Sequence, residues 1–231
     1  MQIDPKLATP QADAVMAARH SVRAYLPKTV DKTLVDELLS ISARAPSGTN
    51  TQPWFVHVLT GNTLNQLVER VCAAFDAQDT SHQPEYDYYP VKFFDPYLAR
   101  RRKIGWDMYS LLGIGKGDMD KTRAQHRKNF EFFGAPVGLI FTIDRRMGKG
   151  SWLDYGMFLQ NIMLAAVARG LDTCPQAAWI DYHTIISEVL QLDEHQQVVC
   201  GMALGYADNE ATVNKLVTER APTSEFVSYH S

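Results

Sequence analysis

Cysteine is scarce in this sequence, and its placement excludes two common uses. The 231 residues include three cysteines, Cys72, Cys174 and Cys200, which are far apart and form no C-x-x-C pair. Disulfide-stapled secreted domains have cysteines in even number, and zinc sites usually contain paired Cys or His ligands. We therefore expect three reduced thiols in the core of a cytoplasmic protein, and no metal site.

Long apolar runs and a basic excess are also missing. No stretch approaches the roughly 18 apolar residues of a membrane span, and the stretch from Met1 to Pro5 has no basic segment followed by an apolar one. The net charge is −3 and the pI is near 6.2, whereas proteins that bind nucleic acids usually have a strong basic excess. These features argue against a membrane or nucleic-acid partner.

Motifs for self-contained catalysis are absent too. The chain has no H-E-x-x-H, no Walker loop and no G-x-S-x-G elbow. The glycines between Gly113 and Asp118 follow an amphipathic helix rather than a strand and lack the G-x-G-x-x-G spacing, which excludes a Rossmann site. If the protein is an enzyme, the absence of a recognisable catalytic motif favours an organic cofactor as the source of its chemistry.

Helical and strand patterns alternate along most of the chain. They predict one helix from an N-cap at Thr9 to about His20 and a second after an N-cap at Asp31. Further helices are predicted over residues 64–71, 106–112, 121–133, 152–169 and 184–191. Strands are predicted over residues 55–60, 137–143 and 198–206. Residues 209–231 show neither period. We find no repeat and no domain boundary, and we expect one domain over residues 1–231.

Two segments have the composition of binding sites. Arg19, Ser21 and Arg23 share one side of an extended connection, where two guanidinium groups and a hydroxyl can hold an anion. The loop from Ala45 to Trp54 contains two prolines and several small polar residues, and Gly48 permits a positive φ there. The alternatives are a solvated polar strand and an ordinary helix-to-strand turn.

Residues 76–118 form an unusual excursion. Its first part contains an aromatic cluster, which either covers a flat ligand or pins a surface loop. A basic run follows, Arg100, Arg101, Arg102 and Lys103, which either attracts an anionic substrate or is a solvated helix face.

Five motifs together resemble the FMN-dependent nitroreductase family, most closely its nitrobenzoate reductase branch. They are Arg19 to Arg23, the A-P-S-G-T-N-T-Q-P-W loop, Phe133 to Pro136, Gly170 to Pro175 and Thr218 to Arg220, and they span nearly the whole chain. The resemblance implies an α+β fold with a mostly antiparallel central sheet flanked by helices, in an intertwined homodimer with FMN at the subunit interface.

The resemblance also assigns candidate cofactor contacts. Arg19, Ser21 and Arg23, with His20 among them, match the motif that holds the phosphate and the pyrimidine side of the flavin, and Arg220 matches a second phosphate ligand. Thr218 replaces a lysine that some members carry. The remaining matches are Pro46, Ser47, Gly48 and Asn50 in the loop from the opposite subunit, Asp154 at the ribityl chain, Asn129 at the ring edge, and Pro175, Gln176 and Ala177 along the N5 edge.

The implied reaction is a ping-pong cycle in which NADH or NADPH reduces the flavin, and a nitroaromatic compound or a quinone then takes the hydride. Electrostatic support is expected from Arg23 and from the backbone N–H of Ala177. We expect Arg100, Arg101 or Arg102 to bind the carboxylate of a nitroaromatic acid such as nitrobenzoate. Rival readings are other flavin reactions on the same fold, a non-enzymatic FMN-binding protein, and a flavin-free hydrolase of phosphate esters.

Overall fold

A four-stranded antiparallel sheet forms the centre of the computed structural model, which describes the backbone of residues 5–231 and the side chains from residue 11 onward. Its strands are β1 (Phe55–Leu59), β2 (Val137–Asp144), β3 (Asp172–Gln176) and β4 (Gln196–Gly205), in the order β1-β2-β4-β3. All three pairings are antiparallel. The predicted mostly antiparallel sheet is confirmed, and the two most apolar strands, β2 and β4, lie inside it.

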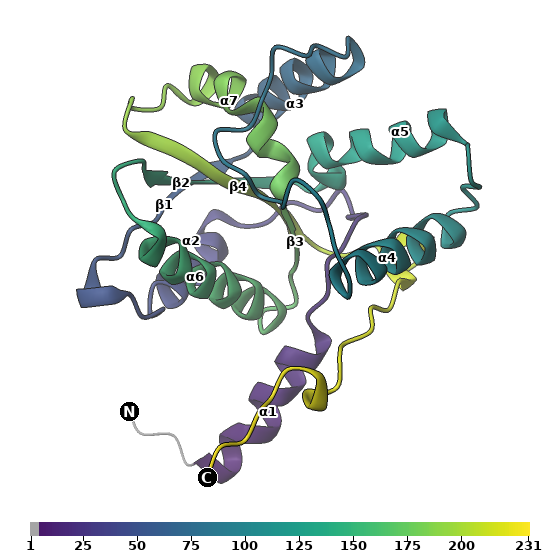
Figure 1. Cartoon of the computed structure of the whole chain (residues 1–231). Coiled ribbons are helices and arrows are strands. Elements are labelled where there is room, and N and C mark those ends of the chain that lie inside the picture. Colours follow the sequence, from purple (N-terminus) through teal and green to yellow (C-terminus); the bar gives the residue numbers. More distant parts are fainter. Residues whose placement is uncertain (1–4) are drawn as a thin grey trace.

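Helices cover both faces of the sheet, which confirms the predicted α+β class (Figure 1). One face packs against α2 (Lys32–Ser42) and α6 (Lys149–Val167). The other packs against α3 (Gly61–Asp76), α7 (His183–Leu190) and the short helices η2 (Lys128–Gly134) and η3 (Ala177–Tyr182). Because strand side chains alternate between faces, Leu139 and Phe141 enter the first core and Ile140 enters the second.

Two strand glycines make room for a stacked aromatic pair. A Cβ on Gly138 would lie 2.7 Å from the ring of Phe132, and a Cβ on Gly201 would lie 2.2 Å from Cδ1 of Trp179. The two rings are fully buried and stack at a centroid distance of 4.3 Å. This pair fastens η2 and η3 to the sheet.

Several helix boundaries differ from the prediction. The first helix, α1, spans Pro5–Ala18, so the predicted N-cap at Thr9 is wrong. Pro5 satisfies the preference for proline in a first turn as well as Pro10 does. The helix predicted over 121–133 is divided: α5 is Met119–Arg127, and the chain continues as the tighter helix η2, in which Phe132 and Phe133 adopt φ of 47° and 56°. The helix predicted over 152–169 is α6, which spans Lys149–Val167 and has its C-cap at Ala168 rather than at Gly170; Gly170 follows in the αL conformation, at φ 69°.

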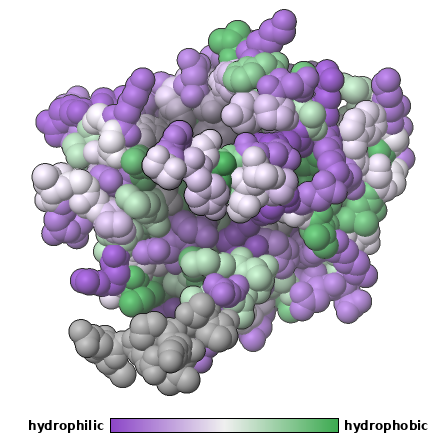
Figure 2. All heavy atoms as spheres, turned by 60° about the horizontal axis from the view of Figure 1, so that its bottom comes forward, coloured by the Kyte–Doolittle hydropathy of each residue, from purple (hydrophilic) through white to green (hydrophobic). Residues whose placement is uncertain are grey.

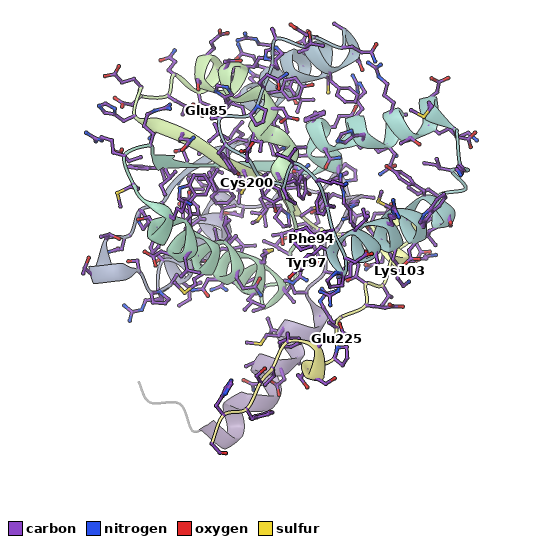
Figure 3. The ribbon with its side chains drawn as sticks, viewed as in Figure 1. Glu85, Phe94, Tyr97, Lys103, Cys200 and Glu225 are labelled. Carbon is purple, nitrogen blue, oxygen red and sulfur yellow. The ribbon has the colours of Figure 1, made fainter. Side chains whose placement is uncertain are left out.

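The predicted excursion has no helix or strand between α3 and α4 (Tyr97–Leu111), and its own side chains pin it to the domain. Glu85 lies 3.1 Å from Nη1 of Arg145 and 3.5 Å from Nδ1 of His183, and the ring of Tyr86 packs on Trp152. Figure 3 shows Glu85 beside α7, far from the start of α4. This part of the excursion therefore matches the pinned surface loop.

The C-terminal segment contains only two short helices, η4 (Thr212–Lys215) and η5 (Thr223–Glu225), and then runs along α1 (Figure 1).

Hydrophilic side chains predominate on the face in Figure 2, with hydrophobic ones in small groups between them. Within residues 5–231, no helix is long and apolar enough to cross a membrane. All three cysteines are buried, as predicted.

Candidate functional site

The segment with Arg19, Ser21 and Arg23 lies against the free edge of β3. Ser21 forms a parallel bridge with Thr173, and the N–H of Val22 donates to the Thr173 carbonyl at 3.1 Å. Val22 is fully buried, so its neighbours Ser21 and Arg23 project the opposite way, as the period of two predicts. The sheet edge therefore fixes where the two side chains point.

These side chains line a cavity of about 570 Å³ whose other walls are α4 and the C-terminal segment. Within the described part of the chain, the guanidinium groups of Arg19, Arg23 and Arg220 form no ion pair with a carboxylate. Burial raises the pKa of the nearby Cys174 thiol to about 11, so the thiol adds no negative charge at neutral pH. Three cations without counter-ions and the Ser21 hydroxyl are suited to a phosphate.

Asn214 fixes the backbone beside Arg23 and was not foreseen from the sequence. Its Oδ1 accepts from the N–H of Arg23 at 2.7 Å, and its Nδ2 donates to the carbonyls of Ala24 and Asp208 at 2.8 and 2.9 Å. The side chain thus ties the C-terminal segment to the anion-binding segment. A single asparagine in a stretch without period gives no sequence signal for this role.

Two further cavities adjoin the first through shared arginines. One, of about 260 Å³, is lined by Arg23, Arg101, Asn129 and Phe133 among others. The other, of about 810 Å³, shares Arg19, His20 and Arg220 with the first cavity and extends to Gln160 and Pro175. The structure therefore gathers nine of the predicted residues around one basic centre: Arg19, His20, Ser21, Arg23, Arg100, Arg101, Asn129, Pro175 and Arg220.

Gln176 and Ala177 follow Pro175 at the junction of β3 and η3. The Gln176 side chain is 2% exposed, donates to the carbonyl of Asn129 at 2.6 Å and accepts from Nε1 of Trp179 at 3.4 Å. Its polar atoms are therefore engaged inside the protein. Gln176 supports the Asn129 segment, and its own side chain is not available to a ligand.

The loop from Ala45 to Trp54 lies away from this basic centre, on the other side of α2 and α6 from α4 (Figure 1). The N–H of Gly48 donates to Oδ2 of Asp154 at 3.0 Å, and the hydroxyl of Ser47 accepts from the N–H of Gln52 at 3.0 Å. Asp154 is 9% exposed. Within one chain, Pro46, Ser47, Gly48, Asn50 and Asp154 therefore form a second group, separate from the first.

The expected use of Gly48 for a positive φ is wrong. The left-handed residues of this loop are Thr49, Asn50 and Gln52, with φ of 50°, 60° and 48°. Non-glycine residues in this region cost about 1–3 kcal/mol each and persist where their surroundings hold them. Gly48 instead brings its N–H to the carboxylate of Asp154, which anchors the strained turn.

The three consecutive arginines of α4 have different surroundings. Arg100 lines the first cavity and pairs with Glu225 at 2.7 Å. Arg101 lines the second cavity, and its guanidinium carbon lies 4.3 Å from the centroid of Phe93 and 5.2 Å from that of Tyr89. Arg102 lines neither of these cavities.

Comparisons with known proteins give one consistent family. Residues 16–206 match the model of the nitroreductase family. The chain is 46% identical to a 4-nitrobenzoate reductase of Pseudomonas putida, over 96% of this chain and 97% of that protein. It resembles the crystal structure of the FMN- and NADPH-dependent nitroreductase NfnB of a Sphingopyxis strain, with 39% identity and a TM-score of 0.91 over 95% and 99% of the two chains. NfnB of Mycobacterium smegmatis, solved in complex with NADPH, is 28% identical with a TM-score of 0.91 over 96% and 100%.

Proposed function

Because this chain belongs to the nitroreductase family, we propose that it is an FMN-dependent NAD(P)H oxidoreductase that reduces nitroaromatic compounds, nitrobenzoate among them, and quinones. One observation of the structure carries the proposal. Arg19, Arg23 and Arg220 meet around a cavity beside the edge of β3, and none of them pairs with a carboxylate of the described residues. Relatives of similar length include a 4-nitrobenzoate reductase and a nitrobenzene nitroreductase, which agrees with this substrate class.

The residues present fit FMN. The phosphate requires cations and hydroxyl donors, which Arg19, Ser21 and Arg220 supply in one cavity. The ring requires donors at its polar edge and backbone along its length, which Arg23, Asn129 and the segment from Pro175 to Ala177 would supply. The position that carries lysine in some members is Thr218, which lines the same cavity and accepts from Arg220 at 2.7 Å.

The protein's own part in the reaction is to bind, orient and stabilise charge. Bound FMN supplies the redox chemistry, because it accepts a hydride equivalent from the reduced nicotinamide and passes it to the acceptor. Arg23 adds a positive charge where negative charge accumulates at the pyrimidine edge, an effect on the order of 1–3 kcal/mol for a charge-assisted hydrogen bond. The Gln176 side chain holds the Asn129 segment beside the end of β3 through its hydrogen bond to the Asn129 carbonyl.

For the substrate carboxylate, the surroundings favour Arg101 over its two neighbours. It lines the same cavity as Arg23 and Asn129, whereas Arg100 is paired with Glu225. Stacking on Phe93 and Tyr89 leaves the in-plane N–H groups of a guanidinium free for a carboxylate. We expect Arg101→Met to lose at least tenfold more kcat/KM on 4-nitrobenzoate than on nitrobenzene. If Arg101→Met lost kcat/KM equally on both substrates, that result would argue against the contact. Arg102→Met is the control, and we expect it to show no preference between the two substrates.

A homodimer completes the site in this proposal. The group of Pro46 to Asn50 with Asp154 belongs to the same fold as the basic centre but lies away from it in one chain. A second copy placed across the interface would bring its loop to the flavin of the first. The three cysteines are free and buried, which suits a reducing compartment, so the cytoplasm is the compartment that we propose.

The decisive experiment starts with the colour of the purified protein. We expect flavin absorbance bands, release of FMN on denaturation, anaerobic bleaching by NADPH or NADH, and reoxidation by nitrobenzoates and quinones. A colourless protein that also fails to bind added FMN would overturn the cofactor. A yellow protein that neither nicotinamide bleaches would overturn the enzyme and leave an FMN-binding protein.

A further inference from the structure

The cavity beside Ser21 contains a second set of cations, which differs from the first in having counter-ions. On α4, Nη2 of Arg100 lies 2.7 Å from Oε2 of Glu225, and Nζ of Lys103 lies 3.3 Å from Oε1 of Glu219. Lys103 also pairs with Asp107 on its own helix at 2.8 Å. Figure 3 shows Lys103 on α4 and Glu225 where the C-terminal segment turns towards α1. Two carboxylates of the C-terminal segment, those of Glu225 and Glu219, therefore form ion pairs with two cations of α4.

These ion pairs are well placed to exchange partners. The Arg100 and Lys103 side chains are each 49% exposed, and Glu219 is 74% exposed, so water and salt screen the pairs and little stability rests on them. A phosphate group carries more negative charge than a carboxylate and offers more acceptor oxygens. A phosphate that enters this cavity can therefore displace Glu225 and Glu219 at small cost.

The difference between the two sets matches a difference between two kinds of ligand. Arg19 and Arg220 have no carboxylate partner among the described residues, which suits an anion that stays in place. Arg100 and Lys103 have partners at hand, which suits an anion that arrives and departs in every turnover. When that anion leaves, the carboxylates can return, so neither Arg100 nor Lys103 is left without a counter-ion, which favours release.

We propose that Arg100 and Lys103 form a second anion subsite, which takes the phosphate groups of the reduced nicotinamide dinucleotide, while Glu225 and Glu219 hold these cations when the dinucleotide is absent. The inference rests on the proposed oxidoreductase function and adds the residues that recognise its reductant. The two cations lie on α4, and Arg101, the proposed carboxylate ligand, lies on the same helix at the adjoining cavity.

The test compares reductants that differ in phosphate content. For wild type, Arg100→Met and Lys103→Met, the dissociation constants of NADPH, of NADH and of the phosphate-free 1-benzyl-1,4-dihydronicotinamide are measured by anaerobic stopped-flow bleaching. We expect each variant to weaken NADPH by about tenfold and to leave the benzyl compound unchanged. Calorimetric titration of the oxidised holoenzyme with 2′,5′-ADP gives a readout without turnover, and the same loss is expected there.

Two further variants sharpen the comparison. Glu225→Gln frees Arg100 of its counter-ion, so we expect severalfold tighter binding of 2′,5′-ADP. Lys32→Met removes a lysine of another exposed i,i+4 pair, in which Nζ lies 2.6 Å from Oδ2 of Asp36 on α2, and it should change none of these constants.

Each remaining outcome has a distinct meaning. Unchanged binding of NADPH and 2′,5′-ADP in both α4 variants would overturn the subsite while the proposed function stands. If the variants weaken FMN but not riboflavin, their cations hold the resident phosphate, and if they weaken 4-nitrobenzoate alone, they hold the substrate carboxylate; either result overturns the inference. A wild-type holoenzyme that none of the three reductants bleaches would overturn the proposed function itself.

Discussion

Replacing Gly201 by alanine tests how the sheet supports the site. Gly201 lies in β4, opposite Gln176 of β3, and a Cβ there would lie 2.2 Å from Cδ1 and 2.8 Å from Nε1 of Trp179. Real Cβ atoms are not found at such distances, so either the strand or the indole must move. Trp179 has no free space, because it is fully buried between Phe132 at 4.3 Å and Phe130 at 5.7 Å between ring centroids.

The expected cost follows from overpacking of a filled core. Extra methyl groups in such positions cost about 1–3 kcal/mol. For a chain of this length, each kcal/mol lowers Tm by about 2–4 °C, so we expect a fall of about 2–12 °C. The control is Gly150→Ala near the start of α6, where nothing lies within 4 Å of the added Cβ and the loss of a helical glycine should leave Tm unchanged or raise it.

The same substitution should weaken the flavin site selectively. Displacing Trp179 disturbs the Gln176 side chain, which holds the Asn129 carbonyl at 2.6 Å beside the second cavity. Because Asn129 is assigned to the ring rather than to the phosphate, riboflavin and FMN should lose affinity equally, as measured by quenching of flavin fluorescence. A variant with wild-type Tm and wild-type flavin affinity would refute the reasoning, because β4 would then accommodate the added methyl group without loss of stability.

Three further predictions concern single groups. Asp154→Ala removes the acceptor of the Gly48 N–H, a hydrogen bond to a charged group worth about 1.5–3 kcal/mol, and thermal denaturation should show that loss together with weaker FMN retention. Arg23→Ala should lower the midpoint potential of the bound flavin in a redox titration; an unchanged potential with FMN still bound would contradict its electrostatic role. Burial raises the pKa of Cys72 and Cys174 to about 11 and that of Cys200 to about 12, so the native protein should resist thiol reagents at pH 8. Because the folded state holds these protons more tightly, Tm should fall as the pH rises from about 8.5 towards 11.

The strands and the central place of two of them in the sheet could be predicted, because both follow from local sequence patterns. Continuous apolar runs from Val137 to Ile143 and from Val198 to Tyr206 identify strands that are covered on both faces, and both lie inside the sheet. The period of two in Arg19, Ser21 and Arg23 is equally local, and the three side chains do line one cavity.

Other features depend on contacts between distant segments, which no local pattern encodes. Phe132 and Phe133 leave the helical region because the first ring enters a space opposite Gly138, a strand residue with no sequence sign of its partner. Lys103 meets Glu219, and Asn214 meets Arg23, across long separations in sequence. Positive φ angles occur at Asn50, a residue type that tolerates them, and at Thr49 and Gln52, which usually avoid them, while Gly48 was the expected site.

The separation of the two residue groups within one chain makes the proposed dimer testable. Exposed apolar side chains line a cavity of about 520 Å³ between α1, α2 and α6; among them, Ile41 is 50% exposed and Met16 is 57% exposed. Large exposed apolar groups of this kind are typical of protein interfaces. If a second copy covers them, a carboxylate at position 41 is buried without a partner and the dimer dissociates.

We therefore expect Ile41→Glu to shift the mass measured by light scattering from dimer to monomer and to release FMN, because Pro46 to Asn50 of the second copy no longer reach it. The matched control is Val91→Glu, which adds the same charge to a fully exposed side chain of the excursion and should change neither mass nor flavin content. A monomeric variant that kept its full complement of FMN would show that one chain holds the cofactor alone. The loop from Ala45 to Trp54 would then have no part in binding it.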